Sequence, residues 1–243
     1  MDVDLAVAAR LIAEPARAAM LDALLSGEAL AAGELARAAG VSPATASDHL
    51  RRLLAGGFVE VTQAGRHRYY RLASADVAHA LEALALVSPA RPVRSLRQSR
   101  TDTATAFART CYDHLAGRIG VAIHDALVHE GLLVAGGDGY DLTVAGEARL
   151  GAIGVDVATA RAGRRAFARG CLDFTERRPH LAGALGAALC SRLVDLTWLV
   201  RRAAGHRALR LTPAGARHLR VHLPTLPALP TAPESGGNRA VSS

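Results

Sequence analysis

The sequence predicts a mainly α-helical protein with small β-hairpin wings, an α+β fold. Three observations support this: a helix-turn-helix pattern followed by a hairpin near the N-terminus, a repeated helix–hairpin–helix pattern in the second half, and a final stretch rich in proline, glycine and serine. They divide the 243 residues into a winged helix-turn-helix domain (1–90), a linker (91–100), a C-terminal domain of two winged-helix-like repeats (101–223) and a disordered tail (224–243).

Two short helices joined by a tight turn form the predicted helix-turn-helix. The first covers residues 34–39, and Gly40 can take the left-handed conformation that ends it. Ser42 can cap the second helix and Pro43 can begin it. Its apolar residues recur at helical spacing: Ala46, Leu50 and Leu53. The preceding residues, 5–25, are expected to form two further helices that pack behind this pair.

The opposite face of the second helix carries short polar groups and cations, which suit contacts with base edges and phosphates. Thr45, Asp48 and Arg52 lie opposite the apolar stripe, with His49 and Arg51 at the margins of this face. The residues of this helix expected to contact DNA are Ser42, Thr45, Ser47, Asp48, His49, Arg51 and Arg52. Residues 58–62 and 68–72 then alternate like the two strands of a hairpin, with Gly65 in the turn between them. The tip of this hairpin is basic, as a wing that contacts phosphates or the minor groove requires: Arg66, His67 and Arg68.

Composition favours an anionic partner and disfavours a membrane or secreted protein. The formal net charge is +7 with a pI of about 10.3, and every one of the 29 basic residues is an arginine. No apolar run reaches the ~18 residues of a membrane span, and the N-terminus lacks the layout of a secretory signal, so we expect a cytoplasmic protein. Three cysteines are too few for a disulfide scaffold and predict free thiols.

The segment GELARAAGVSPATASDHLRRLLAGGFVEVTQAGRHRYYRL, residues 33–72, resembles the winged helix-turn-helix of the ArsR family of bacterial repressors. The resemblance extends over roughly residues 5 to 87. It implies a homodimeric transcriptional repressor that binds a double-stranded DNA operator and leaves it when an inducer binds. It also places a helix predicted over 76–86 in the dimer interface. Members that sense arsenite or soft metals often carry a cysteine pair in the helix matching 34–39, and this sequence has none there.

The second half contains an internal repeat. Residues 114–122 (HLAGRIGVA) are echoed by 180–188 (HLAGALGAA), and residues 141–146 (DLTVAG) by 210–215 (RLTPAG), at nearly equal spacing. Each copy is predicted to form a helix, a short strand pair and a helix. Neither copy has a polar, cationic helix face like that of the N-terminal domain, so we assign this half to effector binding and dimerisation.

Cysteine and histidine occur together in both copies. Cys111 and His114 are spaced three residues apart on a predicted helix, and Cys171 and His180 occupy comparable places in the second copy. A thiolate and an imidazole can bind a metal ion of the zinc, copper or arsenic class, and a thiol can sense an oxidant. Buried structural thiols are the alternative, and Cys190 in an apolar helix is expected to be one.

Two weaker effector sites are conceivable. Asp76, His79 and Glu82 share one helix face and could bind a metal ion, although such spacing is more typical of a solvated face. Four aromatic residues of the second half could line an apolar pocket or simply belong to the core: Phe107, Tyr112, Phe174 and Trp198.

Two other classes of function compete with the repressor. One is a cysteine-dependent enzyme or redox protein that uses Cys111 with His114, but the sequence has no nucleophile elbow and no glycine-rich phosphate loop. The other is a protein-interaction module without specific DNA recognition. The sequence names neither the inducer nor the operator.

Overall fold

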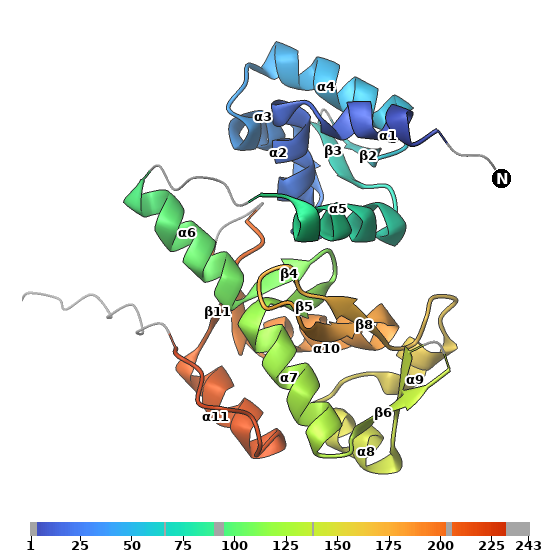
Figure 1. The fold of residues 1–243 in the computed structure, drawn as a ribbon, viewed down its shortest axis with the longest axis vertical. Helices are drawn as coiled ribbons and strands as arrows, with labels where there is room; N and C mark the ends of the chain where they lie inside the picture. Colours follow the sequence, from blue (N-terminus) through green and yellow to red (C-terminus); the bar gives the residue numbers. More distant parts are fainter. Residues whose placement is uncertain (1–3, 66, 90–94, 138, 203–205, 232–243) are drawn as a thin grey trace, which may run out of the picture.

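The protein is described by a computed structural model covering residues 4–65, 67–89, 95–137, 139–202 and 206–231 (Figure 1). Its first half is a small helical body with a three-stranded sheet of order β1-β3-β2. The elements of this half are α1 (Leu5–Ile12), α2 (Pro15–Leu24), β1 (Leu30–Ala31), α3 (Ala32–Ala39), α4 (Pro43–Ala55), β2 (Val59–Ala64), β3 (His67–Leu72) and α5 (Ala75–Val87).

The helix-turn-helix and its wing form where the sequence predicts them. Gly40 ends α3 with φ +66°, and the Ser42 side chain caps α4 by accepting a hydrogen bond from the Thr45 N–H. The apolar stripe of α4 is fully buried, with Ala46, Leu50 and Leu53 all 0% exposed. Strands β2 and β3 pair antiparallel from Val59↔Leu72 to Ala64↔His67. The winged helix-turn-helix is therefore confirmed.

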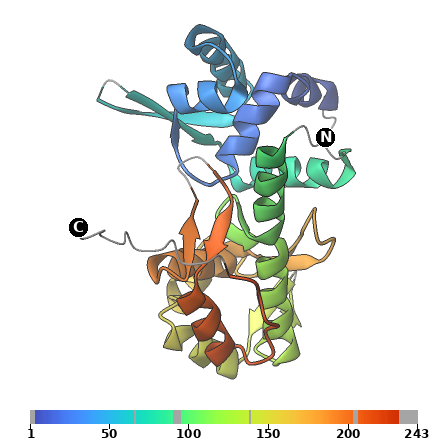
Figure 2. The same ribbon diagram turned by 90° about the vertical axis from the view of Figure 1, so that its left-hand side faces the viewer.

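The second half repeats one order of elements. A helix, a hairpin, a 13-residue helix, a second hairpin and a shorter helix occur twice in this order, in the green-to-yellow and the yellow-to-red segments of Figure 2. The first set contains α6 (Leu96–Phe107), β4 (Arg109–Cys111), β5 (His114–Ala116), α7 (Gly117–His129), β6 (Leu133–Gly136), β7 (Gly139–Leu142) and α8 (Val144–Ala152). The second contains α9 (Val157–Ala162), β8 (Arg169–Leu172), β9 (Pro179–Ala182), α10 (Gly183–Asp195), β10 (Leu199–Arg201), β11 (Leu209–Leu211) and α11 (Pro213–His222).

The two sets pack against each other in a reciprocal way. Helix α7 of the first set lies against β9 of the second, and α10 lies against β5. Gly120 and Gly186, the second glycines of the two repeated motifs, occupy equivalent positions. A Cβ on Gly120 would lie 3.5 Å from the His180 Cβ, and one on Gly186 would lie 3.3 Å from the His114 Cβ. Small residues at these positions therefore let each helix approach the opposite hairpin closely.

Each half has its own hydrophobic core. One cluster of buried side chains extends from Met20 to Ala78, and a larger one extends from Ala108 to Leu226. Figure 1 shows α5 on the side of the N-terminal body that faces the hairpins of the second half. In the part of the chain that is described, no helix is both long and apolar enough to cross a membrane.

Two segments differ from the sequence prediction. Residues 96–100, expected in a linker, belong to α6, because Ser95 caps a helix whose interior contains no proline; residues 90–94 lie outside the described residues. The start of the expected disordered tail is packed, with Leu226 only 3% exposed and the Thr225 N–H donating to Glu130. Residues 232–243 lie outside the described residues.

Candidate functional sites

The outer face of α4 is the first candidate site. Thr45 and Ser47 are exposed, and the side chains of Arg51 and Arg52 are 75% and 59% exposed. Asp48 forms ion pairs with both arginines, with its Oδ2 2.9 Å from Arg52 Nη2. Exposed ion pairs of this kind are weak, so both guanidinium groups can exchange the carboxylate for a phosphate.

Two of the predicted contact residues have local structural roles. The Ser42 hydroxyl accepts a hydrogen bond from the Thr45 N–H at 3.2 Å, and the Ser47 hydroxyl donates to the Pro43 carbonyl at 2.9 Å. Ser42 and Ser47 nevertheless stay exposed on the same surface as Thr45.

His49 was predicted to read bases from this face, and the structure places it elsewhere. Its side chain is only 13% exposed, and its Nε2 lies 3.5 Å from Glu14 Oε2, at the start of α2. Position 49 is adjacent to the buried stripe of α4, which turns the imidazole toward the helical body rather than outward. His49 therefore supports the packing of α4 on α2.

The wing is basic, as predicted. His67 and Arg68 begin β3 and are exposed, and the Arg68 guanidinium carbon lies 5.8 Å from the centre of the Tyr70 ring. Arg66 lies outside the described residues.

The second candidate site is a cluster of two cysteines and two histidines. Cys111 and His114 are not on a helix, as the sequence suggested, but are paired across the β4–β5 hairpin. Cys171 and His180 are paired in the same way across the β8–β9 hairpin. The helical prediction failed because the strands are three residues long and joined by a tight turn in which Tyr112 has φ +62°. Each hairpin therefore contributes one cysteine and one histidine.

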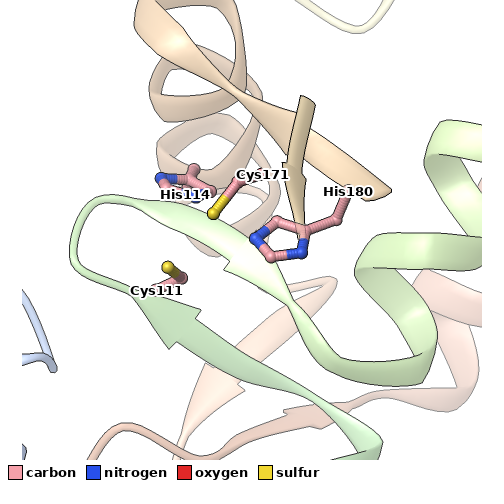
Figure 3. Close-up of side chains that lie close together, drawn as sticks. All are labelled: Cys111, His114, Cys171 and His180. Carbon is pink, nitrogen blue, oxygen red and sulfur yellow. The ribbon is translucent and has the colours of Figure 1, made fainter. Parts of the chain in front are cut away.

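The two hairpins bring these four side chains together. Their potential ligand atoms all lie within 4.8 Å of one another. Figure 3 shows the Cys171 sulfur between the two imidazole rings and facing Cys111. Cys111, His114 and His180 are buried, whereas Cys171 is partly exposed. The rings of His114 and His180 stack with centroids 5.1 Å apart.

The two thiols differ in acidity. The pKa of Cys171 is lowered to about 2, because the Cys111 thiol donates a hydrogen bond to its sulfur and both histidines face it. The same hydrogen bond and burial raise the pKa of Cys111 well above its usual value. A buried thiol with a raised pKa is a poor nucleophile, whereas a thiolate with a lowered pKa is a ready metal ligand.

A carboxylate lies behind each histidine. Asp113 Oδ1 is 3.1 Å from His114 Nδ1, and Asp173 Oδ2 is 3.4 Å from His180 Nδ1. Burial acts to lower the pKa of His114, but the hydrogen bond with Asp113 and the charge of the facing Cys171 sulfur raise it. Sequence reasoning gave neither aspartate a role. Their shared position, two residues after Cys111 and Cys171, was the available indication.

Four buried charged groups lie close together, and one of them, Glu82, comes from the N-terminal half. Glu82 of α5 accepts a hydrogen bond from Arg207 Nη1 at 2.6 Å, and Asp173 accepts one from Arg109 Nη2 at 3.0 Å. Both guanidinium groups also lie over the Phe174 ring, whose centre is 4.0 Å from the Arg109 guanidinium carbon and 5.4 Å from that of Arg207. Two acids therefore balance two cations within this group.

The β4–β5 hairpin also contacts the N-terminal half directly. The Thr110 hydroxyl donates to the Ser26 carbonyl at 3.1 Å, and the Tyr112 N–H donates to the Leu25 carbonyl at 3.0 Å. Gly27 has φ +77°, and a Cβ there would lie 2.0 Å from the Tyr112 carbonyl oxygen. Only glycine permits this approach, so the strand end next to Cys111 is held against the turn after α2.

The weaker effector sites do not form among the described residues. His79 accepts a hydrogen bond from Arg169 at 2.6 Å and Glu82 accepts one from Arg207, and these two do not form a metal-binding group with Asp76. The four aromatic residues are dispersed as well: Trp198 stacks on His218, Tyr112 packs on the N-terminal core, Phe174 lies against two arginines and Phe107 packs on the C-terminal core.

Comparison with known proteins finds similarities to the N-terminal half. Residues 12–62 match a family model described as a helix-turn-helix domain. Among solved structures, NolR from Sinorhizobium fredii is 32% identical and covers 36% of this chain and 86% of its own, with a TM-score of 0.33. The cadmium sensor CmtR from Mycobacterium tuberculosis is 33% identical and covers 38% of this chain and 99% of its own, with a TM-score of 0.30.

A relative of similar length extends the comparison to the second half. The HTH-type transcriptional regulator YdfF from Bacillus subtilis (strain 168) is 41% identical over 223 residues, which is 92% of this chain and 98% of the relative. The match includes both hairpins of the Cys–His cluster. The chain therefore belongs to the family of HTH-type transcriptional regulators.

Proposed function

We propose that this regulator is a homodimeric repressor in the cytoplasm that binds a double-stranded DNA operator through α4 and the β2–β3 wing. An inducer bound by the C-terminal half, residues 101–223, releases it. The observation that supports this most strongly is the exposed face of α4, where Thr45, Arg51 and Arg52 lie opposite a fully buried apolar stripe. A helix with one buried apolar face and one exposed polar, cationic face is suited to insertion into the major groove of DNA.

The exposed apolar residues of α1 and α5 favour a second copy of the chain as partner. Helix α1 buries none of its residues, although its sequence, LAVAARLI, is largely apolar. Leu5 and Val7 of α1 are 75% and 53% exposed, and Leu84 and Val87 of α5 are 42% and 81% exposed. Apolar surface of this kind is typical of an interface, and a two-fold dimer would place two α4 helices on half-sites about one DNA turn apart.

The C-terminal half is proposed to be the effector domain, built from two copies of one unit. The repeated order of elements and the equivalent Cys–His pairs support a duplication. The inducer is proposed to act at Cys111, His114, Cys171 and His180, either as a metal ion or as a thiol-reactive compound. Their cluster lies at the hairpin that contacts the N-terminal half.

The DNA-binding proposal can be tested with duplexes selected by the protein from a random-sequence pool. Thr45→Ala should lose roughly 1–3 kcal/mol of discrimination for the preferred base, with little change on random duplex. Arg52→Ala should weaken binding to both duplexes and reduce the slope of log affinity against log salt by about 1. Arg118→Ala is the matched control, because its side chain is also 59% exposed and paired with a carboxylate, but it lies on α7.

The wing residues give a second comparison. Arg66→Ala and Arg68→Ala should weaken all sequences alike, because a wing that contacts phosphates carries no direct base information. If Thr45→Ala and Arg52→Ala both match Arg118→Ala in a gel-shift titration, α4 does not read DNA. Equal binding of the unaltered protein to selected and random duplexes would instead favour an interaction module without sequence recognition.

A further inference from the structure

We propose that Cys111, His114, Cys171 and His180 form a tetrahedral site for one zinc ion, joining the two hairpins of the C-terminal half. Binding of the ion can be tested without DNA, whereas its role as the inducer rests on the proposed function. Two thiolates and two neutral imidazoles are a ligand set that zinc prefers, and they disfavour ions that require oxygen ligands, such as magnesium and calcium.

The spacing of the ligand atoms fits this ion with a small adjustment. Zinc binds sulfur at about 2.3 Å and imidazole nitrogen at about 2.0–2.1 Å, so tetrahedral ligands lie about 3.3–3.8 Å apart. The four atoms here already lie within 4.8 Å of one another. Side-chain rotations that move the ligand atoms by about an ångström would bring them to the separations of a tetrahedral zinc site. The hairpin register holds each cysteine beside its histidine, so the backbone need not move far.

Unpaired nitrogen atoms are an independent observation. His114 Nε2 and both ring nitrogens of His180 are buried and have no hydrogen-bond partner within the described structure. Leaving such atoms unpaired costs free energy, and a metal ion would satisfy both Nε2 atoms at once. Asp113 is hydrogen-bonded to His114 Nδ1, and Asp173 lies 3.4 Å from His180 Nδ1 without a hydrogen bond, so each carboxylate is on the Nδ1 side and each Nε2 is left for the ion. A carboxylate behind a ligating imidazole is the usual second layer of a zinc site.

The charges and the access path also suit a divalent cation. Two thiolates neutralise Zn²⁺, and ionisation of the Cys111 thiol would release its proton to solvent when the ion binds. Cys171, the partly exposed member, gives the ion a way in, while the other three ligands are buried. A neutral, largely buried centre avoids the cost of burying net charge.

The site is placed to affect the DNA-binding half. Cys111 lies between Thr110 and Tyr112, whose hydrogen bonds to Ser26 and Leu25 hold the hairpin against the turn after α2. Closing the ligand shell around an ion would pull on this strand end. The pull would be transmitted to α2, which packs on both α3 and α4.

The test uses the full-length reduced protein after chelation and gel filtration. Titration with Zn²⁺, followed by native mass spectrometry, should show one ion per chain. Titration with Co²⁺ should give thiolate-to-cobalt charge-transfer absorption and the visible bands of a tetrahedral ion, and Zn²⁺ should displace them. Failure of the unaltered protein to bind either ion would overturn the proposal.

Variants distinguish this cluster from other thiols. Cys171→Ser should lose both the charge-transfer band and stoichiometric zinc, whereas Cys190→Ala, which removes a buried thiol of α10 outside the cluster, should keep both. Asp113→Asn should retain the cobalt spectrum but bind zinc about 10- to 100-fold more weakly, as loss of a second-layer partner does. Far-ultraviolet circular dichroism checks that each variant is folded. A folded Cys171→Ser variant that binds zinc like the unaltered protein would refute the site.

The effect of zinc on DNA binding is measured separately. Zinc should weaken binding of the unaltered protein to its selected operator and should have no effect on the Cys171→Ser variant. If zinc binds to the cluster and operator affinity does not change, the site stands and its role as inducer site is refuted. If the metal-free protein binds no operator, the proposed DNA-binding function fails while the metal titration still decides the site.

Discussion

Replacing Glu82 with alanine would remove one of the two acids that balance the buried cations between the halves. Glu82 is 2% exposed, and its Oε1 is 2.6 Å from Arg207 Nη1. Its second oxygen lies 4.0 Å from Arg109 Nη2. The substitution leaves Arg207, itself 8% exposed, beside a cavity that no longer contains its partner.

The expected cost follows from this burial. Removing one partner of a buried ion pair destabilises a protein by about 3–5 kcal/mol, because the remaining charge stays desolvated and unpaired. Asp22 compensates only partly, since its carboxylate is 59% exposed and lies 3.8 Å from Arg207 Nε. Glu60→Ala is the matched control, because it breaks the pair with Arg71 on the exposed hairpin, where the side chains are 43% and 60% exposed. That change should cost only about 0–1 kcal/mol.

Urea unfolding followed by circular dichroism measures both effects. With a slope of about 2–3 kcal/mol per molar, Glu82→Ala should lower the unfolding midpoint by roughly 1–2 M, and Glu60→Ala by much less. Glu82→Gln, which keeps the shape and one hydrogen bond, should fall between them. A loss for Glu82→Ala within about 1 kcal/mol of that for Glu60→Ala would refute the role assigned to this buried network.

Two further paired substitutions test the assembly and the contact between the halves. Leu84→Glu should weaken a two-fold dimer by about 100-fold or more, because each copy loses roughly 1.5–3 kcal/mol of apolar burial. Val128→Glu on α7 is the control, because Val128 has the same 42% exposure. It should leave the mass measured by light scattering unchanged. Equal effects would place the interface elsewhere. Gly57→Ala should cost about 1–2 kcal/mol for its positive φ alone, because nothing lies within 4 Å. Gly27→Ala has the same backbone strain plus the Tyr112 carbonyl at 2.0 Å, so its urea midpoint should fall clearly further; equal midpoints would mean that this contact is easily displaced.

The N-terminal fold was predictable because its determinants are local. The Ser42 cap, the Pro43 start and the spacing of Leu50 and Leu53 lie within one helix, and the structure keeps all of them. His49 shows the limit of this reasoning. Its position relative to the buried stripe was known, but its partner Glu14 belongs to another helix, and no local pattern indicates that contact.

The Cys–His cluster was identified in part from the repeat, but its geometry was not. The spacing of Cys111 and His114 suits a helix as well as a hairpin, and only the pairing of β4 with β5 decides between them. Cys171 and His180 have a longer connection, which obscured that they hold the same register position. Their convergence depends on the packing of α7 on β9 and α10 on β5, contacts between distant segments that no single window of sequence contains.

The reciprocal packing of the two repeats has an entropic consequence. Neither hairpin holds a complete set of ligands, so an ion in the cluster would cross-link two segments that are far apart along the chain. A cross-link of this kind lowers the conformational entropy of the unfolded chain, and it does so more when the loop that it closes is longer. Occupancy would therefore stiffen the whole C-terminal half, and a fragment containing only one repeat would be unable to hold the ion.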